Sequence, residues 1–143
     1  MSNFNIIKKQ LSIVIGILNF YFNILIKFKN DRKHGKGKLT LKNGDIYEGE
    51  FKNGKKEGKG VYFFADGDKY DGDWKEGKME GKGIYYYSNG YRYEGDYKQD
   101  KREGQGIFYN NNGDRQMGDY LDDKCVGKHV MLNNKGEISV KDY

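Results

Sequence analysis

Four aspartates in one short stretch are the first residues of this sequence that could bind a ligand. They are Asp66, Asp68, Asp71 and Asp73. Carboxylate oxygens suit calcium, but a calcium loop also needs an oxygen ligand at its fifth position and a closing glutamate. Tyr70 occupies that fifth position, and no glutamate stands at the closing one. The spacing therefore predicts no metal site.

Histidine, cysteine and glycine offer no better support for catalysis. His34 and His129 are far apart, and neither has a second histidine nearby, so they predict no zinc site or catalytic base. Cys125 shares its position in the repeat described below with lysine, methionine and arginine, which indicates a variable surface site. The Gly-x-Gly pairs lack a third glycine before a helix and predict no phosphate loop. We expect a protein that is not an enzyme and has no cofactor.

Three consecutive segments of 23 residues organise the chain. They begin YEGEFKNGKKEGKG at Tyr47, YDGDWKEGKMEGKG at Tyr70 and YEGDYKQDKREGQG at Tyr93. A fixed period of this length is typical of repeat proteins, in which each unit buries its apolar face against its neighbours. The period extends in both directions to five units, 24–46, 47–69, 70–92, 93–115 and 116–138. Residues 1–23 form a hydrophobic N-terminal segment, and residues 139–143 form a short tail.

Glycine follows the repeat strictly. Of the 21 glycines, 20 fall on five of the 23 repeat positions, and only Gly16 lies outside them. Each position must require either a positive φ or the close approach of another group.

Each unit is predicted to be a β-hairpin. Alternation places Tyr47, Gly49 and Phe51 on one face, and Asn53-Gly54 is a hairpin turn signal. We expect Phe51 to lie opposite Gly58, and Glu50 to form a cross-strand charge pair with Lys59, repeated as Asp73 with Lys82 and Asp119 with Lys128. Strands are expected near 47–52, 59–64, 70–75, 82–87, 93–98 and 105–110. Tight turns are expected near Gly54, Gly77 and Asn110, links at Gly44, Gly67, Gly90 and Gly113, and no helix between 45 and 115.

The predicted fold is all-β, an elongated twisted antiparallel sheet of stacked hairpins. In-register stacking would form two columns of mainly aromatic side chains, Phe28, Phe51, Trp74, Tyr97 and Tyr120 in one, and Leu39, Tyr62, Tyr85, Phe108 and Met131 in the other. Exposed edge strands could also pair two copies as a homodimer.

Charge and cysteine content limit the partners and the compartment. The net charge of +5 comes largely from residues 1–30, which hold four lysines and no acid, so the repeat array is close to neutral. This predicts no nucleic-acid partner, because such a surface needs one sign of charge on one face. A single cysteine is compatible with a reducing compartment, so we expect a cytoplasmic or cytoskeletal protein.

The N-terminal stretch Gln10 to Ile26 contains no charged residue. Seventeen residues diluted by Ser12, Asn19 and Asn23 are short for a membrane span, and no small-x-small cleavage site follows. Three interpretations stay open: a hydrophobic helix or strand that caps the first repeat, an uncleaved anchor that associates residues 4–26 with a membrane, and a cleaved signal peptide.

The units, written Y-[ED]-G-[ED]-[FWY]-K-x(6)-G-x-G with a further glycine seven residues on, resemble MORN repeats (membrane occupation and recognition nexus). The resemblance covers Ile24 to Ile138. It implies a twisted sheet of hairpins that serves as a scaffold or interaction module, as in proteins of ciliary radial spokes, cytoskeletal scaffolds and membrane junctions. Such arrays are also attached to lipid kinases and to a lysine methyltransferase, but the residues outside this array are too few for either domain. The pattern is broken at Ile24, Ile26, Asp100, Gln116, Asp123 and His129.

Two functions follow as hypotheses. The first is a protein-interaction scaffold that binds a partner along its aromatic and glycine face, through Tyr47, Phe51, Tyr62, Tyr70, Trp74, Gly83, Tyr85, Tyr93, Tyr97 and Phe108. A side chain at Gly83 would then project into the binding groove, and Gly83→Ala should cost about 1 kcal/mol or less. The second is a membrane-tethered module that contacts acidic phospholipid through Lys8, Lys9, Lys27, Lys29 and Arg32.

Overall fold

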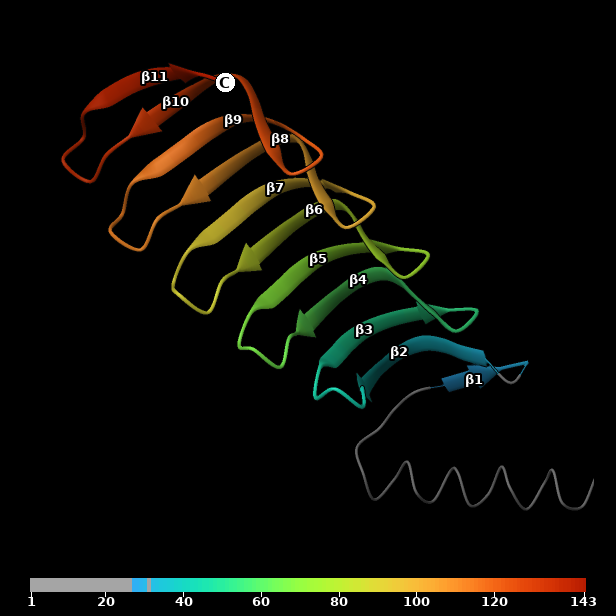
Figure 1. Ribbon diagram of the computed structural model, residues 1–143. Helices are drawn as coiled ribbons and strands as arrows, with labels where there is room; N and C mark the ends of the chain where they lie inside the picture. The colour runs from blue at the N-terminus through green and yellow to red at the C-terminus, as the bar shows by residue number, and fades with distance from the viewer. Residues whose placement is uncertain (1–26, 31) are drawn as a thin grey trace, which may run out of the picture.

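The computed structural model describes residues 27–30 and 32–143. They form one antiparallel sheet of eleven strands, arranged side by side in chain order (Figure 1). The strands are β1 Lys27–Lys29, β2 Arg32–Thr40, β3 Ile46–Lys52, β4 Lys55–Phe63, β5 Lys69–Lys75, β6 Lys78–Tyr86, β7 Arg92–Lys98, β8 Lys101–Tyr109, β9 Arg115–Leu121, β10 Lys124–Leu132 and β11 Ile138–Asp142. The predicted fold class is confirmed, and no helix interrupts residues 45–115.

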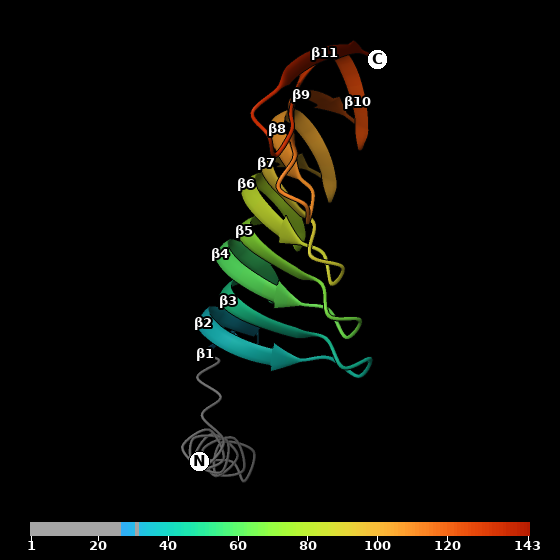
Figure 2. The same ribbon diagram turned by 90° about the vertical axis from the view of Figure 1, so that its left-hand side faces the viewer.

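The ribbon is one layer thick and twists along its length, so successive hairpins are rotated relative to one another (Figure 2). Tight turns lie along one long edge, and the longer links lie along the other (Figure 1). The predicted N-terminal cap or anchor lies outside the described residues. The described part of the chain contains no helix with the length and apolar character needed to cross a bilayer.

Residues with positive φ build the tight turns. Asn53 and Gly54 have φ values of 52° and 86°, as a two-residue hairpin turn of the primed type requires. The prediction of a tight turn near Asn110 is wrong, because the third turn is formed by Gln99 and Asp100, with φ values of 52° and 71°. Asp100 thus takes the left-handed conformation that glycine takes in the two preceding turns, which aspartate tolerates better than most residues.

Each of the four hairpins from β3–β4 to β9–β10 contains a register shift that the sequence did not predict. Gly49 pairs with Gly60 as expected, but Phe51 pairs with Lys56 and not with Gly58. Three residues, 57–59, therefore lie opposite Glu50 alone, and Gly58 has a φ of +71° at this bulge. Gly58 lies opposite Trp74 of the next repeat instead.

The bulge redirects the predicted charge pairs. Lys59 pairs with Asp73 of the following repeat, at 2.5 Å between Nζ and Oδ1, and Lys82 pairs in the same way with Asp96 at 2.7 Å. The expected pairing of Glu50 with Lys59 within one hairpin is therefore wrong. Charge pairs connect successive repeats and do not close single hairpins.

The core lies on one face of the sheet, which we call the aromatic face. Its buried side chains are Tyr47, Phe51, Tyr62, Tyr70, Trp74, Tyr93, Tyr97 and Tyr120. The rings meet edge to face from one repeat to the next, with centroids 5.3 Å apart for Tyr47 and Trp74 and 5.1 Å apart for Tyr70 and Tyr97. Such contacts stabilise ring pairs beyond the burial of their area. The core is a continuous zigzag of rings that each repeat shares with its neighbours.

Candidate partner-binding surface

A buried tyrosine covers the glycine pair of each central hairpin. Tyr70 is fully buried, and a Cβ built on Gly83 would lie 2.6 Å from its ring carbon Cζ. The Tyr70 hydroxyl donates to the main-chain carbonyl of Asp73 at 3.1 Å. Burial raises the pKa of Tyr70, so this hydroxyl stays a donor at neutral pH. These positions require glycine because the tyrosine ring occupies the space that a side chain would fill.

This packing contradicts the expected role of Gly83. A methyl group at that position would meet the Tyr70 ring and not an open groove. Overpacking of this kind typically costs about 1–3 kcal/mol, so we now expect Gly83→Ala to be less well tolerated than the sequence predicted.

The other predicted partner-binding residues fall into two groups, one buried and one half-buried. Tyr47, Tyr70 and Tyr93 have no exposed surface, Phe51, Trp74 and Tyr97 are at most 5% exposed, and Tyr62 is 9% exposed. Tyr85 and Phe108 are half-buried. They belong to a strip of rings near the link edge that also contains Phe64, Tyr87 and Tyr91. A partner on the aromatic face stays a prediction, and this strip would present aromatic surface to it.

Lys56 lies over the aromatic core. Its Nζ is 3.7 Å from the centre of the Trp74 ring and 4.3 Å from that of Tyr62, at cation–π distance. Burial lowers the pKa of Lys56 to about 8, while the rings favour its charged form. The fifth unit has Cys125 at this repeat position, half-buried against the same core. Cys125 is therefore a packing residue and not the surface residue that the sequence indicated.

Aspartates in the links connect one repeat to the next, a role that sequence reasoning missed. Asp68 accepts a hydrogen bond from the Tyr85 hydroxyl at 2.8 Å and another from the Ser88 N–H at 2.8 Å. Burial alone would raise the pKa of Asp68, but these bonds outweigh burial and lower it. Asp45 accepts in the same way from Tyr62 and Ala65. The available signal was the recurrence of aspartate 23 residues apart.

The fifth unit packs a ring over its strands by a different route. Gln116 replaces the tyrosine, His129 replaces the second glycine, and His129 is fully buried. A Cβ on Gly118 would lie 2.6 Å from His129 Nδ1, so the histidine ring covers this glycine from the opposite strand. His129 Nε2 lies 2.8 Å from the carbonyl of Asp119, and Gln116 Nε2 lies 3.0 Å from His129 Nδ1. Sequence reasoning treated both replacements as departures from the pattern and did not predict that they compensate.

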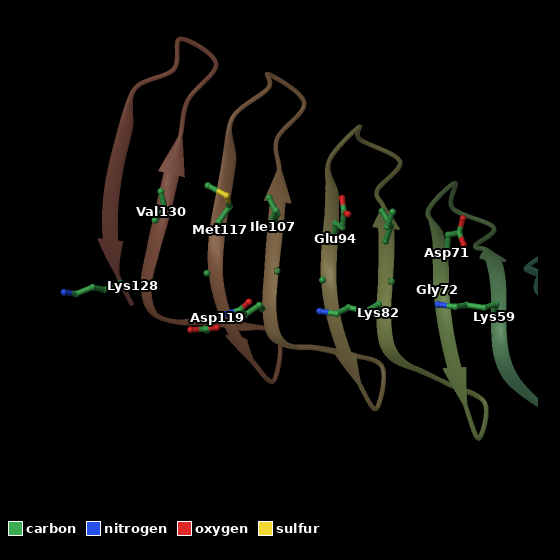
Figure 3. A pocket seen from close by; sticks show the side chains of 16 residues that line it. Lys59, Asp71, Gly72, Lys82, Glu94, Ile107, Met117, Asp119, Lys128 and Val130 are labelled. Carbon is green, nitrogen blue, oxygen red and sulfur yellow. The ribbon is translucent and has the colours of Figure 1, made fainter.

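The opposite face, which we call the charged face, carries an open hollow of about 950 Å³. Figure 3 shows two rows of side chains along it, Lys59, Lys82, Asp119 and Lys128 in one and Asp71, Glu94, Ile107, Met117 and Val130 in the other. Glycine backbone from successive repeats separates the rows and leaves the floor uncovered. From β5 to β7 the second row alternates acidic and apolar side chains, because Ile84 lies between Asp71 and Glu94, and from β8 to β10 it is apolar. The hollow therefore offers both charged and apolar contacts.

The predicted lipid contacts are only partly within the described residues. Lys8 and Lys9 lie outside them, and the side chain of Lys27 is not described. Lys29 and Arg32 are exposed and lie opposite each other in the first hairpin. Within the described ranges, no three His, Cys, Asp or Glu side chains are grouped closely enough to hold a metal ion.

Comparison with known proteins agrees with the repeat geometry. The family model described as MORN repeat matches residues 27–46, 47–69, 70–90 and 93–115. It stops before the fifth unit, where Gln116 and His129 depart from the pattern. No curated protein matches the chain. Because the matched residues make up more than half of the sequence, this chain belongs to the MORN repeat family.

Proposed function

We propose that this protein is a non-enzymatic scaffold that binds a partner polypeptide across several repeats. The hollow on the charged face carries the proposal, because it spans strands β4 to β10 and places charged rows, apolar side chains and bare glycine backbone side by side. The opposite face supports this choice, since most of its rings are buried against one another. Tyr85 and Phe108 are a second contact surface in this proposal.

A ciliary, cytoskeletal or membrane-junction assembly is the setting we propose, by analogy with the MORN family. A rigid ribbon that ties each repeat to the next suits such a role, because it holds bound partners at fixed separations. Homodimerisation through edge strands is compatible with this setting and stays a prediction.

Site-specific photo-crosslinking tests the proposal. A photoreactive phenylalanine analogue is placed at Ile107 in the hollow, at Tyr85 on the aromatic face, and at Asn111 in a link as the control. We expect a discrete adduct from Ile107 and none from Asn111, and the partner is identified by mass spectrometry and purified. Its binding should be lost in Val130→Glu, at a position already 37% exposed, and kept in Asn111→Asp. An adduct from Tyr85 alone would place the partner on the aromatic face.

The alternative is a membrane-tethered module that binds acidic phospholipid through the basic, hydrophobic N-terminus. Flotation with acidic liposomes tests it. Binding by the full chain that disappears on deletion of residues 1–23 supports the tether. Binding by residues 24–143 alone would place lipid recognition on the sheet.

A further inference from the structure

Pairs of lysines face each other across the tight turns of three successive hairpins. The pairs are Lys52 with Lys55, Lys75 with Lys78, and Lys98 with Lys101. All six side chains are exposed, and strand alternation places them on the charged face, since Phe51, Trp74 and Tyr97 beside them point to the aromatic face. We call this row, along the turn edge of the ribbon, the lysine rail.

Like charges directly opposite each other destabilise a β-hairpin. This arrangement nevertheless recurs in all three central hairpins. The turn itself does not require it, because one lysine per hairpin would leave the turn intact. Lys55 has an ion pair with Glu76, and Lys101 has one with Asp122 at 2.9 Å. Within the described residues, the other four lysines have no salt bridge. An anionic ligand along the rail would relieve this repulsion.

The acidic residues near the rail are directed along the ribbon toward neighbouring turns. Glu57 accepts a hydrogen bond from the Glu76 N–H at 3.0 Å, and Glu80 accepts one from the Gln99 N–H at 3.1 Å. Asp100 accepts from the Met79 N–H at 2.8 Å. These carboxylates are used to connect repeats. The next row on the same face is also neutralised, because Lys59 and Lys82 are paired with Asp73 and Asp96.

We propose that the lysine rail binds an acidic, extended segment of a protein partner. The inference rests on the proposed scaffold function and names the chemistry of the partner. Successive lysine pairs are offset by two strand spacings, about 10 Å, and the six strands from β3 to β8 span about 24 Å. An extended chain with carboxylates on one face can therefore follow all three pairs.

The shape of the rail distinguishes this ligand from other polyanions. The ribbon twists, so the rail winds around it and does not lie in a plane (Figure 2). A flat bilayer can therefore contact only part of the rail. Surfaces that bind single-stranded nucleic acid add aromatic rings on which bases stack, and the rail contains none.

Fluorescence anisotropy tests the proposal on the full chain. The probe is a labelled peptide of about ten residues in which glutamate alternates with serine, which spans about 30 Å when extended. The rail variant is Lys75→Gln with Lys78→Gln. The control is Lys42→Gln with Lys135→Gln, which removes the same charge from exposed positions in the links. We expect the rail variant to bind about tenfold more weakly and the control to change by less than about twofold.

Three results would overturn the proposal. They are absence of peptide binding, equal weakening by both variants, and rail-dependent binding of a thymidine oligonucleotide or phosphatidylserine vesicles without binding of the peptide. Thermal melting of both variants checks that each is folded. The scaffold function is tested separately. If crosslinking from Ile107 persists in the rail variant, the scaffold proposal is retained even when the lysine-rail proposal is rejected.

Discussion

The central repeats and the fifth unit both place an aromatic ring over the strands of their hairpin. The ring comes from the first strand of the hairpin in the central repeats and from the second strand in the fifth unit. In the third repeat, Tyr70 on β5 covers Gly72 and Gly83, and its hydroxyl donates to the carbonyl of Asp73. In the fifth unit, His129 on β10 covers Gly118, and its Nε2 lies 2.8 Å from the equivalent carbonyl, that of Asp119. In the four hairpins from β3–β4 to β9–β10, a ring lies over the strands and reaches one carbonyl, and either strand of the hairpin can supply that ring.

The exchange keeps the core continuous. The ring centroids of Tyr120 and His129 are 5.3 Å apart, close to the 5.0 Å between Tyr93 and Tyr120. His129 is in turn 4.9 Å from Tyr143. The fifth unit therefore continues the zigzag of rings although its sequence has left the repeat pattern.

The largest expected effect comes from introducing one of the two fifth-unit replacements, the histidine, into a central repeat. Gly83→His should cost about 4 kcal/mol or more, because two rings would occupy one space. Adding Tyr70→Gln removes the competing ring and should recover about half of the loss, as a coupled pair does. Urea unfolding measures both. A double variant no more stable than Gly83→His would show that the fifth unit depends on its terminal position.

Ring truncation should have the next largest effect, and it should differ between the two regions. Trp74→Ala is expected to cost about 3–4 kcal/mol, because Trp74 packs against Tyr47, Tyr62 and Tyr70 and its Nε1 donates to the Gly60 carbonyl at 3.0 Å.

Tyr120→Ala should cost less, about 2 kcal/mol, because its unit has fewer repeats beyond it. Equal losses at the two sites in urea unfolding would contradict a nearest-neighbour stack. They would also make the fifth unit as important to stability as the central ones.

The smallest effect should be the pH dependence of the link aspartates in the central array. The pKa of Asp68 is lowered in the folded state, so its contribution is present above the ordinary aspartate pKa of about 4 and is lost as pH falls through the lowered value. We expect Asp68→Asn to lower the melting temperature at neutral pH, and the difference from the parent to shrink below about pH 4.

Asp71→Asn is the matched control, since Asp71 is exposed on the charged face. A difference for Asp68→Asn that stays constant with pH would assign its role to shape and not to charge. An equal response of Asp71→Asn would show that the effect is one of general surface charge.

Much of the fold could be predicted from the sequence. The hairpin turn at Asn53-Gly54, the pairing of Gly49 with Gly60 and the common face of Tyr47 and Phe51 follow from local alternation and turn preference. These properties depend on only a few neighbouring residues, and the same local pattern recurs in successive units. The site was harder to predict, because a glycine opposite an aromatic residue is compatible with both an open groove and a filled one.

Tertiary structure alone decided the features that depend on two strands at once. The bulge opposite Glu50 moves the charge pairs to the next repeat, because Gly58 with its positive φ allows extra residues on one strand. The space above Gly83 is filled because Tyr70 leans along its own strand over the glycine pair. His129 can replace that tyrosine only because β9 and β10 place its ring over Gly118. The sequence by itself determined the period, the hairpins and the aromatic face. Register and ring placement required the paired backbone, because shifts of less than an ångström decide whether two close-packed groups fit or clash.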